Sequence, residues 1–102
     1  MTLKSGIDLP LDGIAEICRR YHVRELAVFG SAVQGGLRAD SDIDLLVEFE
    51  PEATVDYFDL FAMEGELQSL LGRKVEATTR SGLKPWIRSL VEQDAQTIYH
   101  AA

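Results

Sequence analysis

Two short apolar segments decide the fold of this chain. They are Leu26-Ala27-Val28-Phe29-Gly30-Ser31 and, after ten intervening residues, Asp42-Ile43-Asp44-Leu45-Leu46-Val47. The first segment ends in two small residues that leave the backbone accessible, and the second begins with two carboxylates separated by one residue. Phosphates need an accessible backbone and divalent cations need carboxylates, so this layout predicts phosphate chemistry supported by metal ions.

The second segment alternates between polar and apolar residues, as a strand with one buried face does. One side carries Ile43, Leu45, Val47 and Phe49, and the other carries Asp42, Asp44, Leu46, Glu48 and Glu50. Residues two apart on a strand point the same way, roughly 6.5–7 Å apart. The two aspartates can therefore share a pair of Mg²⁺ ions roughly 3.5–4 Å apart. The alternative is a turn over residues 39–42 that leads into a strand with an acidic solvent face.

The small residues at the end of the first segment suit a phosphate. Gly30 has no side chain, so a phosphate can approach its backbone closely. If Ser31 begins a short helix, the free N–H groups of that helix offer a seat for an anion, and the Ser31 hydroxyl adds one donor. The alternative is an ordinary strand-to-helix turn with a serine cap.

A third carboxylate is expected from Glu76. In the segment Lys74 to Thr78, Val75 and Ala77 fall on one side and Glu76 on the other. If this strand pairs beside the one that follows Asp42, Glu76 lines up with the two aspartates. It can then hold one metal and accept the proton of an attacking hydroxyl. The alternative is a solvent-facing glutamate on a short edge strand.

Size and composition bound the possibilities. The chain has 102 residues, one cysteine and a formal net charge of −7. We expect a single domain over residues 1–102, without a disulfide framework, a membrane span or a secretory segment, and a cytoplasmic location. Between Arg38 and Arg73 there is no Lys or Arg but ten Asp and Glu residues. This charge argues against direct binding of nucleic acid and favours a nucleotide delivered with cations, or a basic protein partner.

The remaining elements follow from turn residues and hydrophobic spacing. The order helix, strand, strand, helix, strand, helix predicts an α/β or α+β domain, with a small mixed sheet flanked by helices. The expected elements are a helix from Pro10 to about Tyr21, strands from Glu25 to Phe29 and from Asp42, a short helix from Ser31 to Gln34, a helix from Thr54 to Leu71 stopped by Gly72, a strand from Lys74 to Thr78, a helix from Pro85 to about Gln93, and an edge strand from Thr97 to Tyr99.

The long central helix has more apolar residues than one core stripe needs. They are Val55, Tyr57, Phe58, Leu60, Phe61, Ala62 and Met63. The surplus either meets a partner or a second copy of the chain, or is used up by a small core. In the last helix, Lys84 and Arg88 either reach nucleotide phosphates or lie on a solvated face, and Trp86 is expected to pack.

The spacing of these residues resembles a known superfamily. Gly30-Ser31, the pair Asp42 and Asp44, and a carboxylate one strand later are similar to polymerase-beta-type nucleotidyltransferases. The segments Leu70-Leu71-Gly72-Arg73-Lys74-Val75 and Gly82-Leu83-Lys84-Pro85 narrow the resemblance to the minimal nucleotidyltransferases of prokaryotic toxin–antitoxin pairs.

This resemblance implies the polymerase-beta-like fold and a specific activity. The expected reaction transfers AMP from ATP to a tyrosine hydroxyl of a cognate toxin of the helical HEPN family, which neutralises that toxin in a hetero-oligomer. Gly30 and Ser31 would hold the nucleotide phosphates. Asp42, Asp44 and Glu76 would be the catalytic residues and the ligands of two Mg²⁺ ions.

The chain departs from the family pattern at three places. Glu76 stands where the family commonly has Asp, and Ala32, Val33 and Gln34 stand where basic residues are often found. After Glu76 the chain continues with Ala77-Thr78-Thr79 rather than a strongly apolar run. Two other functions therefore stay open. One is an antitoxin that blocks its partner by stoichiometric binding without catalysis, and the other is a subunit of a small-molecule nucleotidyltransferase.

Overall fold

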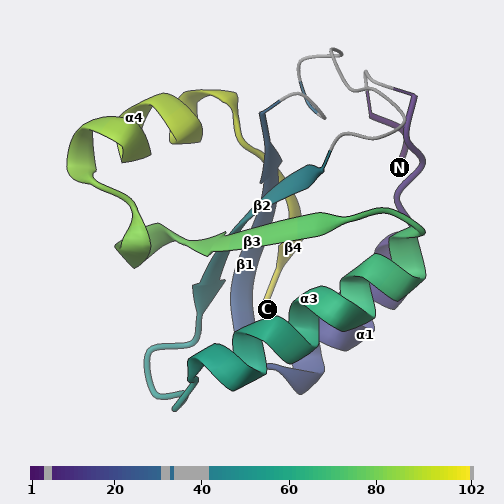
Figure 1. Ribbon diagram of the computed structural model, residues 1–102, viewed down its shortest axis with the longest axis horizontal. Coiled ribbons are helices and arrows are strands. Elements are labelled where there is room, and N and C mark those ends of the chain that lie inside the picture. The colour runs from purple at the N-terminus through teal and green to yellow at the C-terminus, as the bar shows by residue number, and fades with distance from the viewer. Residues whose placement is uncertain (4–5, 31–32, 34–41, 102) are drawn as a thin grey trace.

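The computed structural model describes residues 1–3, 6–30, 33 and 42–101, and it is a mixed α/β structure. Figure 1 shows the helices and strands in space. In chain order the elements are α1 (Leu11–Arg20), β1 (Val23–Phe29), β2 (Ile43–Phe49), α3 (Tyr57–Leu71), β3 (Val75–Thr79), the 3-10 turn η1 (Arg80–Gly82), α4 (Pro85–Asp94) and β4 (Gln96–His100).

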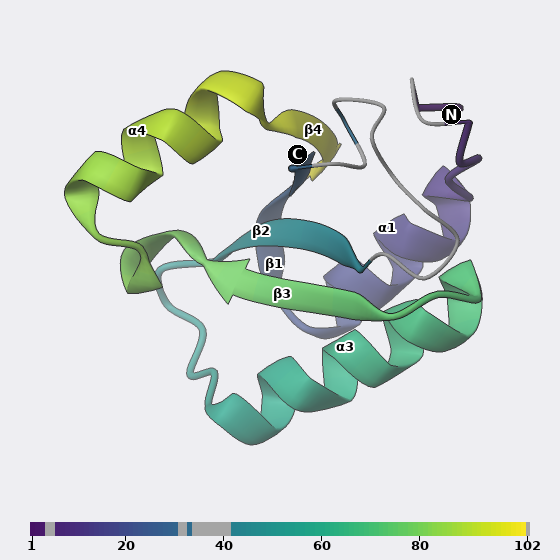
Figure 2. The same cartoon turned by 45° about the horizontal axis from the view of Figure 1, so that its top comes forward.

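The four strands form one mixed sheet in the order β3-β2-β1-β4. β2 runs parallel to β3, whereas β1 is antiparallel to both β2 and β4. Helices α1 and α3 lie side by side on one face of the sheet, and α4 lies on the other face (Figure 2). This arrangement confirms the predicted small mixed sheet flanked by helices.

The hydrophobic core lies between the sheet and the pair α1 and α3. The apolar side of β2 is buried as its alternation predicts, because it faces these two helices. The core includes Ile14, Ile17 and Cys18 from α1, Ile43, Leu45 and Val47 from β2, and Leu60, Met63 and Leu67 from α3.

The other face of the sheet is covered only in part, by α4, and none of the α4 residues is buried. An ion-pair network holds this helix to the sheet. Arg80 contacts Glu25 of β1 at 3.4 Å, Glu48 of β2 at 3.0 Å and Glu92 of α4 at 3.0 Å. The arginine thereby compensates three carboxylates on the face that also carries Asp44.

The long helix begins later than the sequence pattern indicates. Thr54 was the expected cap, but the helix starts at Tyr57 and Asp56 is its N-cap. The Asp56 carboxylate accepts a hydrogen bond from the Asp59 backbone N–H, and the Asp59 carboxylate accepts one from the Asp56 N–H. This reciprocal capping box satisfies two helix N–H groups, which a cap at Thr54 could not do. Gly72 ends the helix with φ +66°, as predicted.

Three further expectations need correction. β1 begins at Val23 rather than Glu25, and β3 is shifted by one residue from the predicted strand. Trp86 is 66 % exposed rather than packed, because α4 has no layer beyond it. The predicted helix from Ser31 to Gln34 lies outside the described residues except for Val33. In the part of the chain that the structure describes, no helix combines the length and apolar content needed to cross a membrane.

Candidate active site

Asp44 and Gly30 meet where β1 ends and β2 begins. Asp44 pairs with Phe29 in the antiparallel register, so its side chain lies beside the residue that follows β1. Gly30 has φ +75°, and a Cβ at this position would lie 2.8 Å from the Asp44 Oδ2 atom. This backbone conformation and this approach both favour glycine. The glycine predicted to hold phosphate thus lies directly against one predicted metal ligand.

The third predicted carboxylate lies on the neighbouring strand. β3 runs parallel to β2, and Glu76 is the register partner of Asp44. Asp42 directly precedes β2, two residues before Asp44, and the Lys74 Nζ atom lies 3.9 Å from its Oδ2 atom. The topology therefore brings Asp42, Asp44 and Glu76 to one edge of the sheet face that α4 covers only in part, as the sequence predicts.

The electrostatics of the three carboxylates favour a cation. The pKa of Asp44 is raised, first by burial of its carboxyl group and then by the negative charges of Glu76 and Asp42. A cation between them would relieve this repulsion, and carboxylate oxygens are the ligands that Mg²⁺ prefers. The chemistry of the residues therefore fits a magnesium ion.

The side chains of Asp42, Asp44 and Glu76 do not converge on one point. Within the described ranges, no three His, Cys, Asp or Glu side chains are grouped closely enough to hold a metal ion. Ligation by all three carboxylates thus requires their side chains to turn toward a shared ion. Ser31, the other predicted phosphate ligand, lies outside the described residues.

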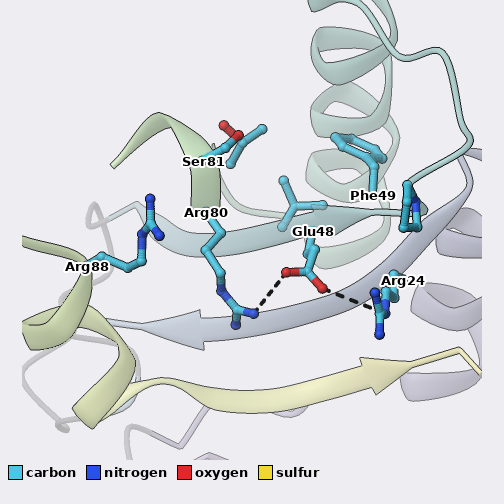
Figure 3. Close-up of a pocket in the computed structure, with 9 residues that line it drawn as sticks. Arg24, Glu48, Phe49, Arg80, Ser81 and Arg88 are labelled. Atoms are coloured by element: carbon cyan, nitrogen blue, oxygen red, sulfur yellow. Dashed lines mark hydrogen bonds and ion pairs between the residues drawn. The ribbon is translucent and has the colours of Figure 1, made fainter. Parts of the chain in front are cut away.

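The pocket in Figure 3 lies at the opposite end of β2 from these carboxylates. Its volume is about 470 Å³, and it is lined by Glu48, Phe49, Thr79 and three arginines, Arg24, Arg80 and Arg88. Arg88, one of the two predicted candidates for phosphate binding with Lys84, lines this pocket rather than the edge with Asp44. The Arg88 guanidinium donates to the Leu83 carbonyl at 3.4 Å.

Sequence reasoning missed Arg80, whose partners lie 55, 32 and 12 positions away in the chain. Only the fold brings Glu25, Glu48 and Glu92 to it. The available signal was weak. It consisted of one arginine directly after a short strand, in a chain with few basic residues.

Comparison with known families shows which family this fold belongs to. The profile of the family described as "Nucleotidyltransferase domain" matches residues 11–98. The chain belongs to the nucleotidyltransferase domain family. The match runs from α1 into β4, so it includes both the strands and the helices of the fold.

Relatives and solved structures place this nucleotidyltransferase among the minimal members of its family. It is 41 % identical over 76 residues to the protein adenylyltransferase MntA of Thermococcus cleftensis, covering 74 % of this chain and 75 % of that protein. A toxin–antitoxin structure with AMP-PNP has a TM-score of 0.75 at 21 % identity, covering 91 % of this chain and 75 % of the other.

A second solved structure has the same fold. It contains a tri-AMPylated HEPN toxin of Shewanella oneidensis in complex with an MNT antitoxin. The TM-score is 0.64 at 17 % identity, and the match covers 89 % of this chain and 70 % of the other. At this level of identity the likeness is one of fold alone.

Proposed function

We propose that this nucleotidyltransferase is an antitoxin that transfers AMP from ATP to a tyrosine hydroxyl of a cognate HEPN-domain toxin in the cytoplasm and so neutralises it. The observation that carries the proposal is the edge where Gly30 lies against Asp44 and Asp44 pairs with Glu76. The protein adenylyltransferase MntA, a relative with 41 % identity, supports the reaction type. The AMPylated HEPN toxin held by a protein of the same fold supports the partner.

Each residue at this edge has a role that follows from its position. Asp42 and Asp44, at the start of β2, and Glu76 of β3 would hold Mg²⁺. When bound, the ion would neutralise charge on the nucleotide phosphates and lower the pKa of an attacking hydroxyl. Gly30 leaves room for a phosphate beside Asp44, and Ser31 donates a hydrogen bond to that phosphate.

The transfer is an in-line displacement at the α-phosphorus of ATP. The tyrosine oxygen forms the new bond to phosphorus, and the bond from that phosphorus to the bridging oxygen of pyrophosphate breaks. Glu76 accepts the proton that the tyrosine hydroxyl loses. The products are the AMP ester of the toxin and pyrophosphate. Glu76 is suited to this role because it lies next to Asp44 yet remains exposed to an incoming acceptor.

The test is a transfer reaction with the protein encoded beside this chain, which the proposal expects to be a HEPN-domain toxin. That protein is incubated with ATP, Mg²⁺ and the nucleotidyltransferase, and its intact mass is then measured. We expect a gain of one or more AMP groups on the toxin with the wild-type chain, and none with Asp42→Ala or Asp44→Ala. An unmodified toxin that nevertheless forms a tight complex would replace the proposal with inhibition by binding alone. Peptide mapping of the product identifies the acceptor, and AMP on a residue other than tyrosine would contradict that part.

A further inference from the structure

Helix α3 carries an aromatic face that the core does not use. Tyr57, Phe58 and Phe61 are 76 %, 84 % and 62 % exposed, and the rings of Tyr57 and Phe61 stack with centroids 6.4 Å apart. They are turned away from Leu60, Met63 and Leu67, the residues of the same helix that enter the core. Three neighbouring exposed aromatic rings are unusual on a protein surface that meets only water.

A glycine continues this face along the helix. Gly65 lies one turn after Phe61, in the interior of α3, and an added Cβ would meet nothing within 4 Å among the described residues. Packing inside the described chain therefore does not require glycine there, although glycine weakens a helix relative to alanine. A small residue beside an aromatic face lets the backbone of a partner approach closely.

The surroundings of the aromatic face are acidic. Residues 42–72 contain no Lys or Arg. Asp56 is the N-cap of α3, Asp59 lies in its first turn, and Glu52 lies in the connection between β2 and α3. Two copies of such a face would repel each other, whereas Lys and Arg of a partner would be attracted both by the carboxylates and by the aromatic rings. The charge thus selects a basic partner over a second copy of this chain.

A pocket beside the first turn of α3 can take an anchoring side chain. It has a volume of about 530 Å³ and is lined by Phe49, Ala53, Val55, Asp56, Tyr57, Leu60, Thr79 and Ser81. Its walls combine apolar side chains with the Thr79 and Ser81 hydroxyls and the Asp56 carboxylate, so a long basic side chain with an apolar stem fits it. Pockets of this kind, next to exposed aromatic rings, are where binding energy concentrates in protein interfaces.

We propose that the aromatic face of α3 (Tyr57, Phe58, Phe61 and Gly65), on the opposite side of the sheet from Asp44 and Glu76, is a docking site for one amphipathic helix of the protein acceptor whose apolar stripe is flanked by Lys or Arg. The inference rests on the proposed function for the identity of that acceptor, the HEPN toxin. α3 begins after the end of β2 opposite to Asp44 (Figure 1). Docking there gives affinity for the acceptor without touching the reacting atoms.

The test compares binding and transfer in surface variants. Calorimetry with the HEPN toxin should give a Kd at least about tenfold weaker for the double variant Phe58→Ser, Phe61→Ser than for wild type. The KM for toxin should rise by a similar factor, with kcat unchanged. The matched control is Trp86→Ser on α4, which removes an equally exposed aromatic ring and should change neither value. Loss of binding by Trp86→Ser, with the double variant at wild-type affinity, would overturn the docking site.

A second variant separates loss of binding from loss of folding. Gly65→Leu adds a strong helix former in open space, so it should raise the melting temperature while it blocks the approach of the partner and weakens binding. For the charge, Glu52→Lys should weaken binding more than Asp12→Lys, which makes the same charge change in the first turn of α1. Equal effects of the two lysines, or unchanged binding by Gly65→Leu, would contradict the proposal.

Failure of the docking site and failure of the proposed function give different results. If wild type binds toxin through this face but transfers no AMP, the docking site stands and the transfer does not. If wild type transfers AMP while the double variant keeps both KM and Kd, the docking site is wrong. If the wild type is a dimer and the double variant Phe58→Ser, Phe61→Ser is a monomer, the face binds a second copy of the chain. That result would overturn the inference.

Discussion

A Cβ atom at position 30 would lie 2.8 Å from the Oδ2 atom of Asp44, so the end of β1 and the start of β2 fit together only with glycine there. The backbone of Gly30 also has φ +75°, a left-handed conformation that is strained for any residue with a Cβ atom. The antiparallel register pairs Phe29 with Asp44, and it thereby places the accessible backbone of Gly30 beside the Asp44 carboxylate.

Gly30→Ala tests this contact. The left-handed conformation costs about 1–2 kcal/mol for a residue with a Cβ, and the new methyl group displaces the Asp44 carboxyl. We expect urea denaturation to give a free energy of unfolding lower by about that amount, and AMP transfer to be lost. The matched control is Gly72→Ala, which has φ +66° but open space at the helix end. That variant should lose similar stability and keep its activity.

Asp44→Asn is expected to stabilise the folded protein. The pKa of Asp44 is higher in the folded chain, so ionisation of this carboxyl costs folding free energy. While the carboxyl is protonated this cost is absent, so the full stability is present below the unfolded pKa of 3.8 and is lost as the pH rises through the folded pKa. Asparagine cannot ionise, so the variant should melt at a higher temperature than wild type at pH 7, and this difference should vanish below about pH 3.8. Asp12→Asn controls for the charge, and a lower melting temperature of Asp44→Asn at pH 7 would contradict the assignment.

Cys18 is expected to be inert in the native protein. Burial raises the pKa of its thiol to about 12, and the side chain lies in the core between α1 and the sheet. The thiolate is the reactive form, so an aromatic disulfide reagent at pH 8 should react only as fast as the protein unfolds. In urea the reaction should be immediate. Rapid labelling of the folded chain would mean that α1 opens readily.

The capping box of α3 should contribute more to the free energy of unfolding than Thr54, which precedes it. Asp56→Ala removes a carboxylate that accepts the Asp59 N–H, and loss of such a cap costs about 1 kcal/mol. Thr54→Ala, two residues earlier, should change the free energy of unfolding by much less because Thr54 lies outside the helix. Urea titration measures both. Equal losses would mean that the helix extends back to Thr54.

Sequence patterns predicted those features that depend on local alternation. Asp42 and Asp44 were predicted to share a side because a strand repeats every two residues. Glu76 was predicted to join them because Val75 and Ala77 take the other side of its strand, and the parallel register pairs it with Asp44. Competing local signals were harder to resolve. Thr54 and Asp56 are both good caps, and only the reciprocal bonds with Asp59 decide between them.

Long-range contacts and exposure could not be predicted in this way. The partners of Arg80 come from two other strands and a helix, so the fold must be known before they can be paired. Trp86 was expected to be packed because a large aromatic residue favours burial, yet α4 lies on the thinly covered face and leaves it exposed. The surplus apolar residues of α3 divide between the core and the surface, which a single sequence left open.

The most direct test of the central claim is the rate at which the Glu76→Gln variant adds AMP to the HEPN toxin, followed by intact mass with ATP and Mg²⁺. Glutamine keeps the shape of the side chain but can neither accept the proton nor offer a carboxylate. Glu50→Gln, just after the far end of β2, serves as the control. We predict that wild type and Glu50→Gln modify the toxin, while Glu76→Gln folds normally by circular dichroism and transfers no AMP. Transfer at the wild-type rate by Glu76→Gln would contradict the account.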